Sequence, residues 1–174
     1  MKRLAFLIIM MLVTSLHAEP LTQADVSRLE SYSTIEHVVY ETYTSTDSGA
    51  SSVFGYQFDR FFSPTWYGAL AIYGAVGGDR GGYGIAAVGF GYRPMVMNKT
   101  YADFTFLVGS GGGGGIPAGG GLAFEAHGGI SYEFLPQLFL DLKGGYLSFP
   151  SGTFQTPVLQ VGLSYQINRL FLPF

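Results

Sequence analysis

The sequence contains no cysteine and few charged residues, and both absences restrict what the chain can be. Without cysteine, disulfide bonds and thiolate metal sites are excluded. Charged residues make up 12% of the 174 residues, against about 25% in ordinary soluble domains. Aromatic residues reach 16%, which a disordered chain would lack. The composition therefore indicates one folded domain whose surface carries little charge.

Long apolar runs are also scarce. Lys2 and Arg3 precede an apolar run from Leu4 to Val13, and Leu16-His17-Ala18 then offers a cleavage site before Glu19. This order predicts a signal peptide over residues 1–18 that is cleaved on export. The run is too short for a membrane-spanning helix, which needs about 20 residues, so a retained N-terminal anchor is the alternative. No later segment supplies the apolar length of a membrane helix.

Basic residues are too few for a nucleic-acid partner. Without Lys2 and Arg3, seven of the nine basic residues remain against twelve acidic ones, whereas nucleic acid demands a basic surface. No Lys or Arg lies between Lys99 and Lys143, so the glycine-rich stretch 108–129 lacks the Gly-Lys-Ser/Thr of a phosphate-binding loop. Strand-like segments flank residues 110–121, which argues against a domain linker. The sequence predicts an outer loop there, and no cofactor.

Polar and apolar residues alternate most clearly from Leu122 to Phe134 and from Leu138 to Tyr146. A turn over 135–137 connects these two runs. Pairing Phe134 with Leu138 sets the register of the hairpin. The pairs that follow match apolar with apolar and polar with polar: Tyr132 with Leu140, Ile130 with Leu142, and Ser131 with Asp141. A hairpin must pass this test, so these runs predict two paired strands.

Similar runs recur along the chain and predict eight strands, each close to the 9–11 residues that a tilted strand needs to cross a bilayer. The runs cover residues 35–44, 52–59, 66–77, 83–92, 101–109, 122–134, 138–146 and 158–167. They predict an all-β fold, an eight-stranded antiparallel up-and-down transmembrane β-barrel over residues 34–174. Residues 19–33 form a short N-terminal periplasmic segment, either a helix capped at Thr22 or an irregular lead-in. Glycine and alanine leave the facing of 66–77 and 83–92 open.

The polar faces of these strands carry groups that can pair with one another inside a barrel. They are Gln57, Asp103, Glu125, His127, Asp141, Lys143 and Gln160. The opposite faces are apolar, which is the arrangement expected when lipid surrounds the barrel. Aromatic residues near the predicted periplasmic strand ends would form an interfacial girdle: Phe58, Trp66, Tyr92, Tyr132, Phe134 and Tyr165. One alternative is a soluble sandwich with these aromatics in its core. Another is a soluble periplasmic barrel that binds an apolar ligand, like a lipocalin.

The last predicted strand reads Gln160-Val161-Gly162-Leu163-Ser164-Tyr165-Gln166-Ile167. Gln160, Gly162, Tyr165 and Ile167 resemble the terminal assembly signal of bacterial outer-membrane barrels. Residues 168–174 depart from that pattern, either extending the strand or lying beneath the barrel. With the signal peptide and the eight runs, the mature chain resembles the small eight-stranded outer-membrane barrels, the class of OmpA's membrane domain, OmpX, OmpW and PagL.

That resemblance implies an outer-membrane location, contact with outer-membrane lipids and recognition by the barrel-assembly machinery. It leaves the oligomeric state open and does not select an activity, because such barrels differ in function. Structural, interfacial and passage roles for a small apolar molecule all fit this class.

Catalysis has one pair of candidate residues, Glu125 and His127, which could act in acid–base chemistry on membrane lipid. The PagL-type deacylases carry a His-x-Ser motif, which is absent here because Gly128 and Gly129 follow His127. The alternative is a charge network that fills a narrow barrel, which His37 and Glu41 could join. One of the three histidines lies in the predicted signal peptide, so the sequence predicts no metal site.

Overall fold

The computed structural model describes residues 30–45, 49–78 and 81–171. Within these ranges every regular element is a strand, and no helix has the length and apolarity to span a bilayer. The strands are β1 Glu30–Ser45, β2 Gly49–Phe61, β3 Trp66–Gly78, β4 Gly84–Tyr92, β5 Met95–Met97, β6 Thr100–Gly112, β7 Leu122–Leu135, β8 Leu138–Ser148 and β9 Gln155–Phe171.

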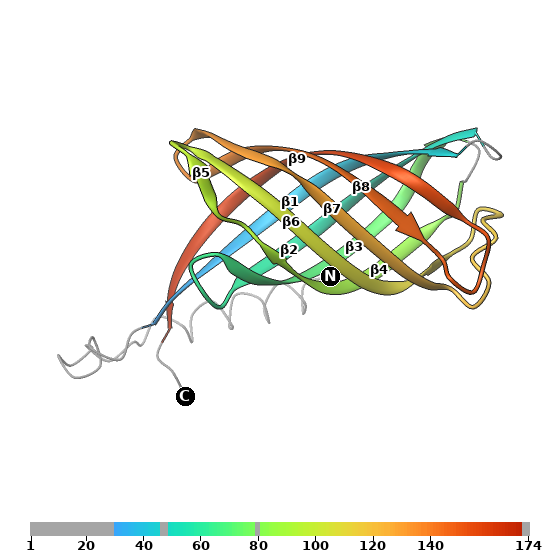
Figure 1. The fold of residues 1–174 in the computed structure, drawn as a ribbon, viewed down its shortest axis with the longest axis horizontal. Coiled ribbons are helices and arrows are strands. Elements are labelled where there is room, and N and C mark those ends of the chain that lie inside the picture. The colour runs from blue at the N-terminus through green and yellow to red at the C-terminus, as the bar shows by residue number, and fades with distance from the viewer. Residues whose placement is uncertain (1–29, 46–48, 79–80, 172–174) are drawn as a thin grey trace, which may run out of the picture. The chain divides into compact units, whose positions relative to one another are not determined.

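Eight long strands form a closed antiparallel barrel (Figure 1). Neighbours in sequence are neighbours in the sheet, β1 pairs with β9, and β4 pairs with β6, which closes the ring. The short β5 pairs only with the start of β6. Closure gives every long strand a neighbour on both sides, whereas an open sheet edge in lipid would leave backbone donors and acceptors unpaired.

All eight predicted strands are present, and several are longer than the sequence pattern indicated. β1 begins at Glu30, inside the segment 19–33 that was predicted to precede the barrel. β9 continues to Phe171, so residues 168–171 extend the last strand. The signal peptide prediction and residues 172–174 lie outside the described residues. The extra strand β5 was not predicted, because its Met-Val-Met sequence has no alternation.

The β7–β8 hairpin has the predicted register except beside its turn. Ile130 pairs with Leu142 and Tyr132 with Leu140, as predicted. The predicted pair of Phe134 with Leu138 is wrong, because Leu135 pairs with Leu138 and the register shifts between Glu133 and Leu135. Gln137 has a left-handed φ of 66°, so the chain reverses in two residues and Phe134 is left as a bulge.

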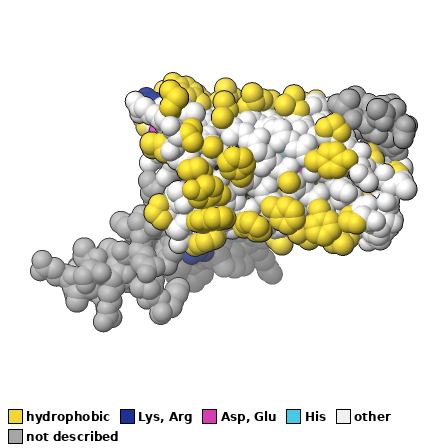
Figure 2. All heavy atoms as spheres, viewed as in Figure 1, with side chains coloured by type: hydrophobic (Ala, Val, Ile, Leu, Met, Phe, Trp, Pro, Cys, Tyr) yellow, Lys and Arg dark blue, Asp and Glu magenta, His cyan; other side chains and the backbone are white. Residues whose placement is uncertain are grey.

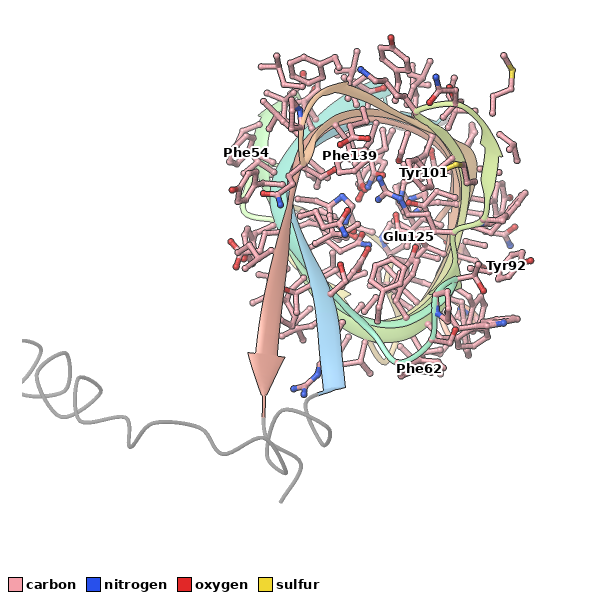
Figure 3. All side chains as sticks on the ribbon, turned by 90° about the vertical axis from the view of Figure 1, so that its left-hand side faces the viewer. Phe54, Phe62, Tyr92, Tyr101, Glu125 and Phe139 are labelled. Atoms are coloured by element: carbon pink, nitrogen blue, oxygen red, sulfur yellow. The ribbon has the colours of Figure 1, made fainter. Side chains whose placement is uncertain are left out.

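The two faces of the wall have opposite polarity. On β8, Leu140 and Leu142 lie on the outer face and are 48% and 49% exposed. The alternating residues Asp141 and Lys143 point inward and are at most 2% exposed. Figure 2 shows hydrophobic side chains spread over the outer wall, with Lys and Arg near its left-hand end. Viewed along the barrel in Figure 3, Glu125 points into the interior. The polarity of a water-soluble barrel is therefore inverted here.

Glycines on β2 and β4 make room for large tyrosines on β3. The inward face of β3 carries Tyr67 and Tyr73, both at most 2% exposed. A Cβ at Gly91 of β4 would overlap the Tyr67 ring, and a Cβ at Gly55 of β2 would overlap the Tyr73 ring. Glycine at these two positions, on the strands that flank β3, thus has a packing reason.

Adding one methyl group at Gly91 is expected to destabilise the barrel by about 1–3 kcal/mol, the usual cost of overpacking. The Tyr67 ring would have to move, and its hydroxyl would lose the 2.6 Å hydrogen bond that it donates to Asp103. Gly74→Ala is the matched control, since a Cβ there meets no atom within 4 Å. Urea unfolding of both variants measures the difference, and equal stabilities would contradict this packing role.

At one end of the barrel, here called the loop end, two connections pack together over the interior. They are the glycine-rich loop 113–121 and the β8–β9 loop 149–154. Thr153 N donates to Pro117 O at 3.0 Å, joining the two loops. Gly119 has a φ of 59°, and a Cβ there would overlap the backbone of Ser151. The apolar side chains beneath them are buried, among them Tyr83, Ile116, Leu147, Phe149 and Phe154.

The opposite end, here called the turn end, carries the short connections β2–β3 and β7–β8 and the strand β5. Arg93 lies inside this end, 3% exposed, with its guanidinium 4.6 Å from the centre of the Phe139 ring and 5.4 Å from that of Tyr101. Phe139 is buried as well. Buried side chains therefore occupy both ends of the barrel.

Candidate functional site

Every inward polar residue that the sequence analysis singled out is buried in the barrel interior. These residues are Gln57, Asp103, Glu125, His127, Asp141, Lys143 and Gln160. The structure separates them into two groups. The larger, called the Asp–Lys–His network, contains His37, Gln57, Asp59, Tyr67, Arg93, Asp103, Thr105, Ser131, Asp141 and Lys143. The smaller, called the Glu–Glu–His cluster, consists of Glu41, Glu125 and His127, with Gln160 beside it.

Asp103 on β6 is one centre of the Asp–Lys–His network. Lys143 Nζ lies 2.9 Å and Arg93 Nη1 3.5 Å from its Oδ2, while the Tyr67 hydroxyl donates to Oδ1 at 2.6 Å. A buried carboxylate needs such partners, because transfer from water without them is costly. The four groups come from β3, β6, β8 and the segment after β4, so the contacts tie four parts of the wall together.

His37 on β1 joins two further carboxylates of the network. Its Nε2 lies 2.8 Å from Asp59 Oδ2 and its Nδ1 lies 3.1 Å from Asp141 Oδ2. A histidine donates from both nitrogens only as the imidazolium, so this geometry fits the charged ring. Ser131 donates to Asp141 as well. With His37 charged, three carboxylates face three cations and the network is electrically balanced.

The Glu–Glu–His cluster brings together two strands, β1 and β7. His127 Nε2 lies 3.3 Å from Glu125 Oε1 and 3.7 Å from Glu41 Oε1. All three side chains are at most 5% exposed. A Cβ at Gly145, the residue paired with His127 on β8, would overlap the imidazole, so glycine there admits the ring.

Glu41 accepts hydrogen bonds from two side chains, whereas its two neighbours in the cluster have no hydrogen-bond partner among the described residues. The Tyr43 hydroxyl donates to Glu41 Oε2 at 2.9 Å, and Gln160 Nε2 donates to Glu41 Oε1 at 2.8 Å. In contrast, neither carboxylate oxygen of Glu125 and neither ring nitrogen of His127 has a hydrogen-bond partner among the described residues. Both residues take part in the ion-pair contacts within the cluster.

The proposed catalytic pair, Glu125 and His127, is thus adjacent but enclosed by the barrel wall. Neither side chain faces the outer surface, where lipid acyl chains would lie. The pair sits between the Asp–Lys–His network and the buried apolar side chains of the loop end. A lipid substrate has no approach to these groups through the outer face, so the arrangement is typical of an internal polar cluster.

Sequence analysis missed several members of the interior. His37 and Glu41 were named as possible members, but Asp59, Tyr67 and Arg93 were not. Asp59 has the inward parity of Gln57 on β2, and that signal was available. Tyr67 lies in a strand whose small residues hid the parity. Arg93 follows the end of β4 and enters the interior from a connection, which alternation does not describe.

The residues of the terminal pattern lie on both faces of β9. Gln160 and Gly162 are inward and buried, and Tyr165 is outward and 48% exposed. Gln160 contacts Glu41, as described above. The Tyr165 hydroxyl donates to Gln137 Oε1 at 3.2 Å, next to the β7–β8 turn. Ile167 accepts a hydrogen bond from Thr34 Oγ1 through its carbonyl at 3.2 Å, across the β1–β9 junction.

No protein-family model matches the chain, and no curated protein matches its sequence. Solved structures do match. The N-terminal β-barrel domain of Pseudomonas aeruginosa OprF has a TM-score of 0.57 at 10% identity, covering 78% of this chain and 97% of that one. A de novo designed transmembrane β-barrel has a TM-score of 0.56 at 16% identity, covering 78% and 95%.

The Yersinia pestis outer membrane protein Ail has a TM-score of 0.53 at 14% identity, covering 79% of this chain and 100% of that one. The fold is that of a small transmembrane β-barrel. Likeness at these identities concerns the fold, and activity must be argued from the residues of this chain.

Proposed function

We propose that the chain is an exported outer-membrane protein of a Gram-negative bacterium, with residues 1–18 removed as a signal peptide. The observation that carries this proposal is the inverted polarity of the wall, apolar outside and ionised inside. Such a surface is stable in lipid and would aggregate in water. The similarity to the outer-membrane protein Ail supports the same location. Outer-membrane lipids are then the first partner of the apolar wall.

Within that location, the proposed role is structural or interfacial, without a channel along the barrel axis. Eight strands leave an interior that side chains fill. Here Lys143, His37 and Gln57 are among the largest fully buried side chains, and aromatic residues occupy both ends. The filled interior gives no support to passage of a small apolar molecule along the axis. The enclosed position of Glu125 and His127 gives no support to a lipid-modifying enzyme. The apolar outer wall gives no support to a lipocalin-like carrier.

Biogenesis would follow the route of other outer-membrane barrels. The barrel-assembly machinery is the proposed partner during insertion, with Gln160, Gly162, Tyr165 and Ile167 as the recognised residues. The strand that carries them pairs with β1 at the point where the ring closes, so it is an edge until the last step. Edge pairing with the machinery would occupy the same backbone groups that β1 later takes.

Fractionation and electrophoresis test the location. The protein is expected in the outer-membrane fraction, to need detergent for extraction, and to migrate differently with and without boiling because the closed barrel resists unfolding. Release by a salt wash, or recovery with soluble periplasmic proteins, would exclude a membrane-spanning barrel.

Planar lipid bilayers test the absence of a channel. Folded protein at high loading is expected to give no discrete conductance steps, because charged and aromatic side chains fill the axis. A porin of known conductance inserted in the same membrane serves as the positive control. Regular unitary steps that depend on the protein would show that the interior opens, and would contradict the proposed role.

A further inference from the structure

The Glu–Glu–His cluster differs from the rest of the interior in its charge. The Asp–Lys–His network matches three carboxylates with His37, Arg93 and Lys143. Glu41 and Glu125 face only His127 in the ion pairs of the described residues. Even a charged imidazole would leave the pair of carboxylates with an excess of negative charge. Burying such an excess is costly unless a proton or a further cation neutralises it.

The ligand atoms of the cluster converge at distances that suit one small metal ion. One carboxylate oxygen of Glu41, one of Glu125 and one ring nitrogen of His127 all lie within 4.8 Å of one another. A tetrahedral ion with bonds of about 2.0 Å holds its ligands about 3.3 Å apart. The separations of 3.3 and 3.7 Å from the imidazole nitrogen to the two oxygens are close to that value.

The hydrogen bonding points to the same place independently. Both oxygens of Glu125 and both ring nitrogens of His127 are buried without a hydrogen-bond partner among the described side chains. Buried polar atoms of this kind are uncommon and require an explanation. Glu125 is 1% exposed and points into the barrel (Figure 3), so its free oxygens face the cluster and not solvent.

We propose that Glu41, Glu125 and His127 bind one divalent transition-metal ion of the Zn²⁺ class inside the barrel. Two carboxylates neutralise its charge, and the imidazole nitrogen favours Zn²⁺ over Mg²⁺ or Ca²⁺, which prefer oxygen alone. The Tyr43 hydroxyl donates to Glu41 Oε2 and the Gln160 amide to its Oε1, so both orient this carboxylate, as outer partners do in metal sites.

Alternation alone could not indicate this site. Glu41 lies on β1 while Glu125 and His127 lie on β7, and the three meet only across the closed barrel. The expectation of no metal site rested on the scarcity of histidine and cysteine. One histidine is enough for the proposed metal site, because Glu125 on the same strand and Glu41 on a distant strand supply the other ligands.

The test uses the folded full-length protein, purified in detergent from bacterial membranes without a histidine tag. Because the cluster is enclosed, the protein is also refolded from urea with either Zn²⁺ or a chelator present. Metal content per folded chain is measured after gel filtration, and Co²⁺ replaces Zn²⁺ to report the coordination geometry through its visible absorption. Heat-modifiable mobility verifies that each sample is folded.

Glu125→Gln and His127→Gln remove one ligand each while keeping a polar side chain of similar size. Glu36→Gln is the matched control, since Glu36 lies on the same strand as Glu41 but on the outer face. We expect one Zn²⁺ per folded chain in the wild type and in the control. Both ligand variants should lose affinity by at least about tenfold, the scale of disrupted metal sites. Excess Mg²⁺ should not displace Zn²⁺.

Two results would overturn the proposal. The first is folded wild-type protein that retains no more Zn²⁺ or Co²⁺ than Glu125→Gln after refolding in the metal. The second is metal binding that survives unchanged in both ligand variants, which would place the ion elsewhere. If one variant fails to fold, the other serves as the comparison for both results.

Discussion

Replacing Lys143 with methionine is expected to lower the free energy of unfolding by about 3–5 kcal/mol, the usual cost of breaking a buried ion pair from one side. Lys143 is 2% exposed and its Nζ lies 2.9 Å from Asp103 Oδ2. Methionine fills most of the same volume, so the loss is one of charge rather than of packing. Of its two ion-pair partners Asp103 would keep only Arg93, at 3.5 Å, besides the hydrogen bond from the Tyr67 hydroxyl. Asp141 and Asp59 would face one cation fewer.

Urea unfolding in detergent, followed by boiled and unboiled electrophoresis, measures this effect. Lys99→Met is the matched control, because Lys99 is exposed in the turn between β5 and β6, and a change of at most about 0.5 kcal/mol is expected there. Adding Asp103→Asn to Lys143→Met restores the balance of charges, so the pair should cost less than the sum of the two single changes. Equal stability of Lys143→Met and Lys99→Met would show that the network carries little energy.

Replacing Leu142 with arginine is the second change with a large expected effect. Leu142 lies on the outer face of β8, paired with Ile130 on one side and Val161 on the other. An arginine facing lipid in the middle of a barrel strand costs about 2–4 kcal/mol at the bilayer midplane. Unfolding from lipid vesicles is therefore expected to show a loss of that size.

Thr153→Arg provides the control, since Thr153 is exposed in the β8–β9 loop beyond the strands. Little change is expected there, because a charge at the loop end remains in water. The same Leu142→Arg change would be neutral on a barrel surrounded by water. A neutral result in vesicles would therefore exclude lipid contact at this position.

The sequence was most informative where large apolar and charged residues alternate. The order Leu140, Asp141, Leu142, Lys143 predicts which side chains point outward and which inward. The register of the β7–β8 hairpin then follows from matching such residues across the two strands. β3 was harder, because glycine and alanine carry little preference for either face. Its inward tyrosines are amphipathic, so Tyr67 and Tyr73 could equally have been placed at a membrane interface.

The contacts within the interior could not be predicted in the same way. His37 meets Asp141 from 104 positions away in the chain. Which inward residues meet across the axis depends on the tilt and stagger of the closed ring, and alternation on a single strand does not contain that information. The bulge at Phe134 depended on the left-handed backbone of Gln137, which is an unusual choice for a residue other than glycine.

The alternation of polar and apolar residues has a consequence for the proposed export of this chain. A translocon at the inner membrane retains segments that are apolar for a helix length, about 20 residues. Every strand described here is shorter than that, and polar or glycine residues interrupt the apolar ones within each strand, so no strand supplies a segment that would be retained. On the proposed export route, the apolar outer surface would form only when the ring closes, after the chain has crossed the inner membrane.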